Sequence, residues 1–244
     1  MNVSPVVLVF LYGLLTALAT GLGALPFLFM KQLSNRSVSY ANAVASGLML
    51  GASFGLVSEG VGHGRWQTMV GANVGVLFII LTQRILGEHQ LAFGSLRGAN
   101  ARQMLLIVIV MTVHSFSEGV AVGAAFGGGM TLAVAITAAI AVHNIPEGLA
   151  ISAVLRPRGT SVLGCAGWSI FSSLPQPLMA VPAFLFVEAF RPALPYGIGF
   201  AAGAMVYMVL QELLPDAYEH GPRPATALIV STTVVGMVLF QQYL

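Results

Sequence analysis

Two short stretches of the chain carry the residue types and the spacing of a metal site. One is HSFSEG at 114–119, and the other is HNIPEG at 143–148. In each stretch a His and a Glu are four residues apart, which places them about one turn apart on the same face of a helix. Each helix can therefore present an imidazole nitrogen and a carboxylate to one point. Together, His114, Glu118, His143 and Glu147 would supply four ligands for a divalent metal ion.

Both His/Glu pairs lie within long apolar segments. A carboxylate near the middle of a bilayer is unfavourable by several kcal/mol, so an ionisable residue there indicates a functional site. The windows 113–123 and 142–152 align without gaps and share Val, His, Glu, Gly and Ala, which indicates two paired helices that face each other. The alternatives to a metal site are a proton relay and an intramembrane His–Glu pairing that holds no metal.

The composition excludes a soluble domain. Hydrophobic residues make up 57% of the 244 residues, charged residues make up 7%, and the mean hydropathy is +0.88. Too little polar surface is available to cover a water-soluble protein, so we predict an all-α integral membrane protein with a single polytopic domain over residues 1–244. No Lys or Arg precedes Lys31, so the first apolar stretch is expected to be a retained span rather than a cleaved signal peptide. The single cysteine, Cys165, allows no internal disulfide and no thiolate cluster.

Eight apolar segments have the length, about 20 residues, that crosses a bilayer as a helix. They lie near residues 5–30, 38–58, 66–86, 103–127, 130–155, 161–187, 193–215 and 225–243. With the odd-numbered loops in the cytoplasm, eight of the ten Lys and Arg residues fall inside, and only Arg65 and Arg191 fall outside. The positive-inside rule favours this orientation. Both termini are then expected outside, and the longest loop, 87–101, is expected to be a short cytoplasmic loop.

Glycine and proline predict how these spans pack and where they break. Small residues at four-residue spacing, at 47–55, 71–75 and 199–203, predict close approach of helix backbones. Pro146 cannot donate to the carbonyl of Val142, so a kink and a free backbone oxygen are expected at the level of the second motif. Pro175 and Pro177 predict a similar break in the sixth span. Interrupted helices at mid-membrane form ion sites in transporters.

These motifs resemble the ZIP (Zrt/Irt-like) family of divalent metal transporters, in particular its bacterial GufA-related branch. The resemblance includes GLML at 47–50, SLPQP at 173–177 and ELLP at 212–215, besides the two His/Glu motifs. It implies an eight-helix bundle in a 3+2+3 arrangement, with inverted three-helix repeats flanking the fourth and fifth helices. The metal site would lie between those two helices. It would consist of His114, Glu118, His143 and Glu147, with Met49 close by.

The resemblance also implies a second metal position beside the first. That position would use the residue after each His, a shared Glu147 and a carboxylate from the sixth helix. In this sequence the unshared positions are Ser115, Asn144 and Gln176, so an amide replaces the expected carboxylate. Neutral amides and hydroxyls are poorer ligands for a divalent cation than a carboxylate is, so we expect one tightly bound ion.

Polar residues at the inner end of the seventh span resemble the carboxylate-lined exit of the family. They are Gln211, Glu212 and Asp216. The alternative is that Asp216, Glu219 and His220 are solvated loop residues, and for Glu219 we favour this interpretation.

At the outer end of the second span, Glu59 and His63 either attract cations at the entrance or lie among lipid headgroups. Glu188 and Arg191 are expected to form an interfacial pair.

The leading hypothesis is a transporter that imports a divalent transition metal by alternating access. Zinc is the foremost candidate, followed by iron, manganese, cobalt and cadmium, and the absence of a thiolate site argues against copper(I). The metal would be the substrate, and no cofactor is expected. One alternative is an intramembrane zinc hydrolase with a Glu as general base, although the near-symmetry of the motifs gives both glutamates the same role. Another is a proton-coupled carrier of an organic solute.

The expected partners are the divalent cation and the lipid bilayer, with no nucleic acid. The family resemblance adds a homodimer as an expectation. Short loops and the lack of a His-rich insert point to a bacterial plasma membrane, the inner membrane, as the location.

Overall fold

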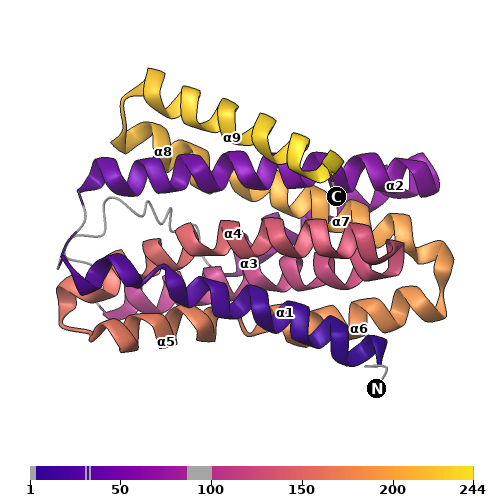
Figure 1. Ribbon diagram of the computed structural model, residues 1–244, viewed down its shortest axis with the longest axis horizontal. Helices are drawn as coiled ribbons and strands as arrows, with labels where there is room; N and C mark the ends of the chain where they lie inside the picture. Colours follow the sequence, from indigo (N-terminus) through magenta and orange to yellow (C-terminus); the bar gives the residue numbers. More distant parts are fainter. Residues whose placement is uncertain (1–3, 31, 33, 87–100, 244) are drawn as a thin grey trace.

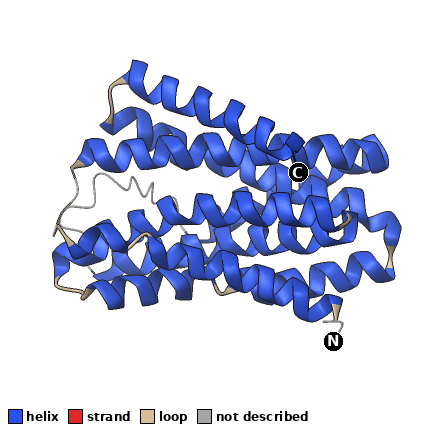
Figure 2. Cartoon of the chain, viewed as in Figure 1, coloured by secondary structure: helices blue, strands red, loops and turns tan. Residues whose placement is uncertain are grey.

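The computed structural model describes residues 4–30, 32, 34–86 and 101–243 (Figure 1). Within these residues every regular element is a helix (Figure 2). Six segments of the described chain are long and apolar enough to cross a membrane. The prediction of an all-α, multi-pass membrane protein is thereby confirmed. The predicted cytoplasmic loop at 87–101 lies outside the described residues, except for Ala101, where a helix begins.

The helices follow one another with short connections. In chain order they are α1 (Pro5–Leu22), the 3-10 turn η1 (Leu25–Leu28), α2 (Asn35–Leu86), α3 (Ala101–Gly128), α4 (Met130–Leu155), the 3-10 turn η3 (Arg156–Arg158), α5 (Val162–Ser173), α6 (Pro175–Ala189), the 3-10 turn η4 (Arg191–Ala193), α7 (Leu194–Met208), the π-helical turn η5 (Val209–Leu213), α8 (Leu214–His220) and α9 (Arg223–Tyr243).

The longest element, α2, consists of two helical arms. Its 52 residues are interrupted at Gly64, where the backbone leaves the helical region with φ 166° and ψ 102°. A Cβ at Gly60 would lie 2.8 Å from the side chain of Thr68, whereas residues eight apart in a straight helix are separated by about 12 Å along the axis. The chain therefore folds back at Gly64. The arms 35–63 and 65–86 correspond in position to the predicted second and third spans.

Prolines account for two of the other interruptions. The predicted sixth span divides into α5 and α6 at Leu174, next to Pro175, as expected for residues that lack a backbone donor. The π-helical turn η5 precedes Pro215, which cannot donate to the carbonyl of Gln211, and widened turns of this kind often occur at functional sites. In contrast, α4 continues as one helix through Pro146.

The helices pack in two groups. One group contains α1, α3, α4, α5 and α6, in which α3 lies along α6 and α1 lies along α4 and α6. The other contains α2, α7, α8 and α9, with α2 as the main neighbour of both α7 and α9 (Figure 1). The groups meet chiefly where α2 packs on α4 and where α3 packs on α7.

Glycines permit the closest approaches within both groups. A Cβ at Gly47 would overlap Thr233 of α9, and one at Gly75 would overlap the carbonyl oxygen of Phe200 in α7. At Gly148, the last residue of the second His/Glu motif, a Cβ would overlap the carbonyl oxygen of Thr20 in α1. For Gly47 and Gly75, the prediction that small residues serve close packing is confirmed. The contact at Gly148 also holds α1 directly against the motif-bearing part of α4.

Candidate metal site

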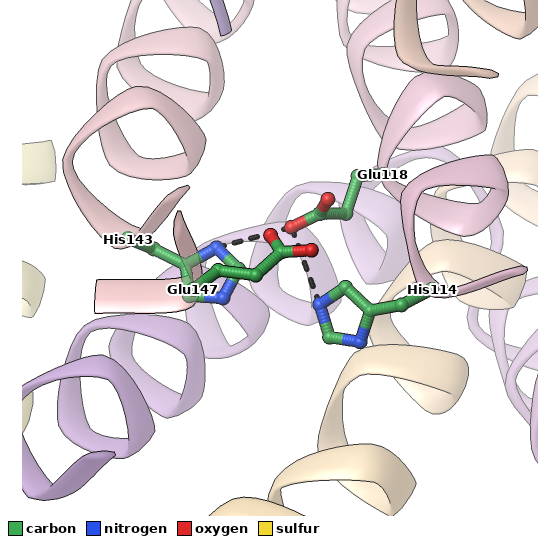
Figure 3. Close-up of side chains that lie close together, drawn as sticks. All are labelled: His114, Glu118, His143 and Glu147. Atoms are coloured by element: carbon green, nitrogen blue, oxygen red, sulfur yellow. Dashed lines mark ion pairs between the residues drawn. The ribbon is translucent and has the colours of Figure 1, made fainter. Parts of the chain in front are cut away.

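The two His/Glu motifs meet between α3 and α4. Figure 3 shows the side chains of His114 and Glu118 from α3 pointing toward those of His143 and Glu147 from α4. One ligand atom from each residue can be chosen so that all four lie within 4.8 Å of one another. All four residues are at most 3% exposed. The structure thus brings together the four residues that the spacing of the motifs predicts as ligands.

Glu118 lies at the centre of the cluster. Its Oε1 atom is 3.0 Å from Nδ1 of His143 and 3.5 Å from Nε2 of His114 (Figure 3). These three atoms are buried and, apart from these two contacts with one another, have no hydrogen-bond partner among the described residues. A carboxylate oxygen and two imidazole nitrogens that face one another at these distances are donor atoms that a divalent cation can share.

Glu147 completes the donor set. Both of its carboxylate oxygens are buried and lack hydrogen-bond partners among the described residues. A buried carboxylate needs a compensating positive charge, and a divalent ion at this point would supply it. Two imidazoles and two carboxylates form a set that zinc, iron and cobalt accept. The residues therefore fit a divalent transition metal.

A line of polar groups adjoins Glu118 on the side away from the histidines. Gln176 Nε2 donates to Glu118 Oε2 at 2.6 Å, and Asn144 Nδ2 donates to Gln176 Oε1 at 3.0 Å. Asn144 Nδ2 also donates to the carbonyl oxygen of Thr16 at 2.8 Å. Both amide side chains are fully buried. Nothing in the sequence pattern indicated that Thr16 accepts this hydrogen bond, because the acceptor is its backbone carbonyl and not its side chain.

The predicted second metal position falls on these same amides. Asn144 Oδ1 and Ser115 Oγ are buried without hydrogen-bond partners among the described residues, whereas both nitrogen and oxygen of the Gln176 amide are engaged. Ion binding at this position remains a prediction. Met49 is fully buried in the main hydrophobic core, and its closeness to the ligands also remains a prediction.

Of the residues predicted for the exit, Glu212 is held by a hydrogen bond. It lies on η5 and accepts a hydrogen bond of 2.6 Å from Gln83 Nε2. Glu212 and Gln83 belong to the group of helices opposite the four ligands. The sequence analysis did not single out Gln83, although a polar residue within an apolar span was a usable signal. Gln211 is exposed.

Asp216 is not a solvated loop residue. It is 3% exposed, accepts a hydrogen bond of 2.6 Å from Asn42 Nδ2, and lies 3.3 Å from Nδ1 of His220. Glu219, in contrast, is exposed, as expected. Asp216 therefore joins α8 to the first arm of α2, and its place on the exit path remains a prediction.

One of the two residues predicted for the entrance, Glu59, lines a cavity. Glu59 and His63 are 3.1 Å apart and partly exposed. The cavity, about 340 Å³ in volume, lies between α2, α4 and α9 and is lined by Glu59, Met130 and Gln241 among others.

The predicted pair of Glu188 and Arg191 is present, with an N–O distance of 3.0 Å, and Arg191 also donates to the carbonyl of Gly127. This arginine thereby connects the start of η4 to the end of α3.

Comparison with known proteins extends over most of the chain. A family model described as "ZIP Zinc transporter" matches residues 88–240. "Zinc transporter GufA" of Myxococcus xanthus is 33% identical over 93% of this chain and 95% of its own length. "Zinc transporter ZIPB" of Bordetella bronchiseptica is 32% identical over 83% of this chain and 70% of its own length. A protein of Arabidopsis thaliana assigned as a zinc transporter is 45% identical over 93% of this chain, which spans only 37% of that protein's length.

Proposed function

The chain belongs to the ZIP family of zinc transporters, and on that premise we propose that it imports divalent transition-metal ions, zinc foremost, into the cytoplasm. The observation that carries the proposal is the buried cluster of two imidazoles and two carboxylates inside an apolar helix bundle. His114, Glu118, His143 and Glu147 are proposed to bind the ion during passage. The metal is the substrate of the protein and not a resident cofactor.

The hydrolase alternative finds no support among the relatives, which are named transporters. A proton-coupled carrier of an organic solute finds no support among them either. The geometry favours an ion as the substrate, because the ligand atoms converge within 4.8 Å.

We propose eight membrane crossings in the 3+2+3 arrangement. The break at Gly64 supports this count, because it divides α2 into two arms of span length. The eight crossings are the two arms of α2, two interrupted crossings (α5 with α6, and α7 with α8), and the single helices α1, α3, α4 and α9. The ligands then lie on the fourth and fifth crossings. A homodimer remains an expectation from the family.

The division of the helices into two groups suggests how the site is exposed to each side in turn. All four ligands, and the amides beside Glu118, belong to the group of α1, α3, α4, α5 and α6. Displacement of this group along α2 and α7 would carry the ion without breaking its coordination. Glu212, which lies on the opposite group, would offer a carboxylate to the ion as it leaves.

Uptake into proteoliposomes tests the proposal. Purified protein in vesicles that enclose a zinc-sensitive dye should admit zinc faster than protein-free vesicles do. External iron, manganese, cobalt or cadmium should slow zinc entry to the extent that each ion binds the site. Zinc entry no faster than in protein-free vesicles, with no competition by any of these ions, would exclude a metal transporter.

The proposed orientation places both termini outside a bacterial plasma membrane. It predicts that a cysteine at position 219 faces the cytoplasm and that one at position 62 faces outward, since both positions are exposed. On a Cys165→Ser background, an impermeant thiol reagent added to intact cells should label Gly62→Cys and spare Glu219→Cys. Permeabilised cells should show labelling of both variants. The opposite pattern in intact cells would invert the topology.

A further inference from the structure

The hydrogen bonds beside Glu118 form a line from the backbone carbonyl of Thr16 to the carboxylate of Glu118. The acceptors at the two ends of this line determine which group donates in each bond. The backbone carbonyl of Thr16 can only accept, so the Asn144 atom 2.8 Å away from it is the NH₂ group. The same NH₂ group lies 3.0 Å from Gln176, which must therefore present its oxygen to Asn144. This leaves the NH₂ group of Gln176 facing Glu118 Oε2 at 2.6 Å. The orientation of each amide, often ambiguous, is set by the acceptors at both ends.

The two glutamates consequently differ, although their motifs are nearly identical. Oε2 of Glu118 is held by Gln176, and only Oε1 faces the histidines. Glu147 has no such partner, because neither of its carboxylate oxygens has a hydrogen-bond partner among the described residues. Glu118 is therefore a ligand with one available oxygen and a defined orientation. Glu147 is a ligand with two available oxygens.

Close backbone packing holds the donor in place. A Cβ at Gly119 would lie 2.6 Å from the carbonyl oxygen of Gln176, so this glycine allows α6 to approach α3 next to Glu118. On the other side, a Cβ at Gly13 would lie 2.7 Å from Cα of Pro177, which brings α1 equally close to α6. The start of α6, which carries Gln176, is thus held between α1 and α3.

We propose that Gln176 and Asn144 are positioning residues, which restrict Glu118 to binding the ion through Oε1 alone. The inference rests on the proposed transport function, because it requires the ion to bind at these four ligands. Groups that hydrogen-bond a metal ligand fix its orientation, and losing one commonly weakens metal binding about 10- to 100-fold. Here a neutral amide performs this task at the position where the family resemblance implies a carboxylate ligand.

Cobalt binding to the purified protein tests this assignment, because the visible absorption of Co²⁺ reports the number and geometry of its ligands. The variants are Gln176→Met and Asn144→Leu, which keep similar volume and remove the amide, together with the double variant. Ser173→Ala is the matched control: it removes a buried hydrogen bond of 2.8 Å to Thr20 in the same part of the bundle. That serine is not part of the amide line.

We expect both single variants to bind Co²⁺ about 10- to 100-fold more weakly and to share one altered absorption spectrum. The double variant should bind no more weakly than either single variant, because both act through the same bond to Glu118. Ser173→Ala should keep the wild-type spectrum. If Asn144→Leu does not fold, the spectrum of Gln176→Met alone decides the matter.

A wild-type spectrum and affinity in Gln176→Met would overturn the positioning role while leaving the proposed transport function intact. Losses that multiply in the double variant would also overturn it, since they would show that the two amides act separately. Failure of the wild-type protein to bind Co²⁺ at all would instead reject the metal site and, with it, the proposed function.

Discussion

Alanine at His143 or Glu147 should reduce zinc uptake to the level of protein-free vesicles. Each substitution removes one of four donors and leaves the remaining buried ligands with an incomplete coordination sphere. Because loss of a group that only orients a ligand already costs about 10- to 100-fold in affinity, loss of the ligand itself should cost more than about 100-fold. The same result is expected for His114→Ala and Glu118→Ala.

Zinc uptake at a fixed external concentration, together with zinc affinity on the purified variants, measures this effect. Ser152→Ala is a suitable control, since it removes a fully buried hydroxyl on α4 that has no hydrogen-bond partner among the described residues. It should transport at nearly the wild-type rate. Normal uptake by both His143→Ala and Glu147→Ala would show that the ion does not pass through this cluster.

Substitution of Gln176 by Glu should convert the protein from binding one metal ion to binding two. Two divalent ions a few ångströms apart repel each other strongly in a poorly screened interior. In the wild-type cluster the negative charge comes from Glu118 and Glu147, and the amide of Gln176 is occupied by its bond to Glu118. A carboxylate at position 176 would face Glu118 directly, and a second cation between them would relieve the repulsion.

Equilibrium dialysis followed by metal analysis of the purified protein gives the number of ions bound. We expect one tightly bound zinc per wild-type chain, two per Gln176→Glu chain, and slower release from that variant, because a better-held ion leaves less readily. Gln176→Met, which adds no charge, should still bind at most one. Two equally tight ions in the wild-type protein would contradict the charge argument.

Several features of this protein could be predicted from its sequence, because they depend on local spacing or on composition. A His and a Glu four residues apart share a helix face in any helical fold, so the placement of His114 beside Glu118 on one helix face, and of His143 beside Glu147 on another, followed directly. Few charged residues and long apolar segments sufficed to predict the membrane setting. The break next to Pro175 follows from the missing backbone donor.

The sequence pattern was less informative where partners are distant. Near-identical motifs suggested equal roles for Glu118 and Glu147, but the bonds that distinguish them join residues 32, 58 and 128 positions apart. The burial of Asp216 likewise depends on Asn42, which is 174 positions away. Local periodicity determines which face of a helix a side chain occupies. Its hydrogen-bond partners and its burial depend on which helices pack against that face, and only the tertiary structure decides this.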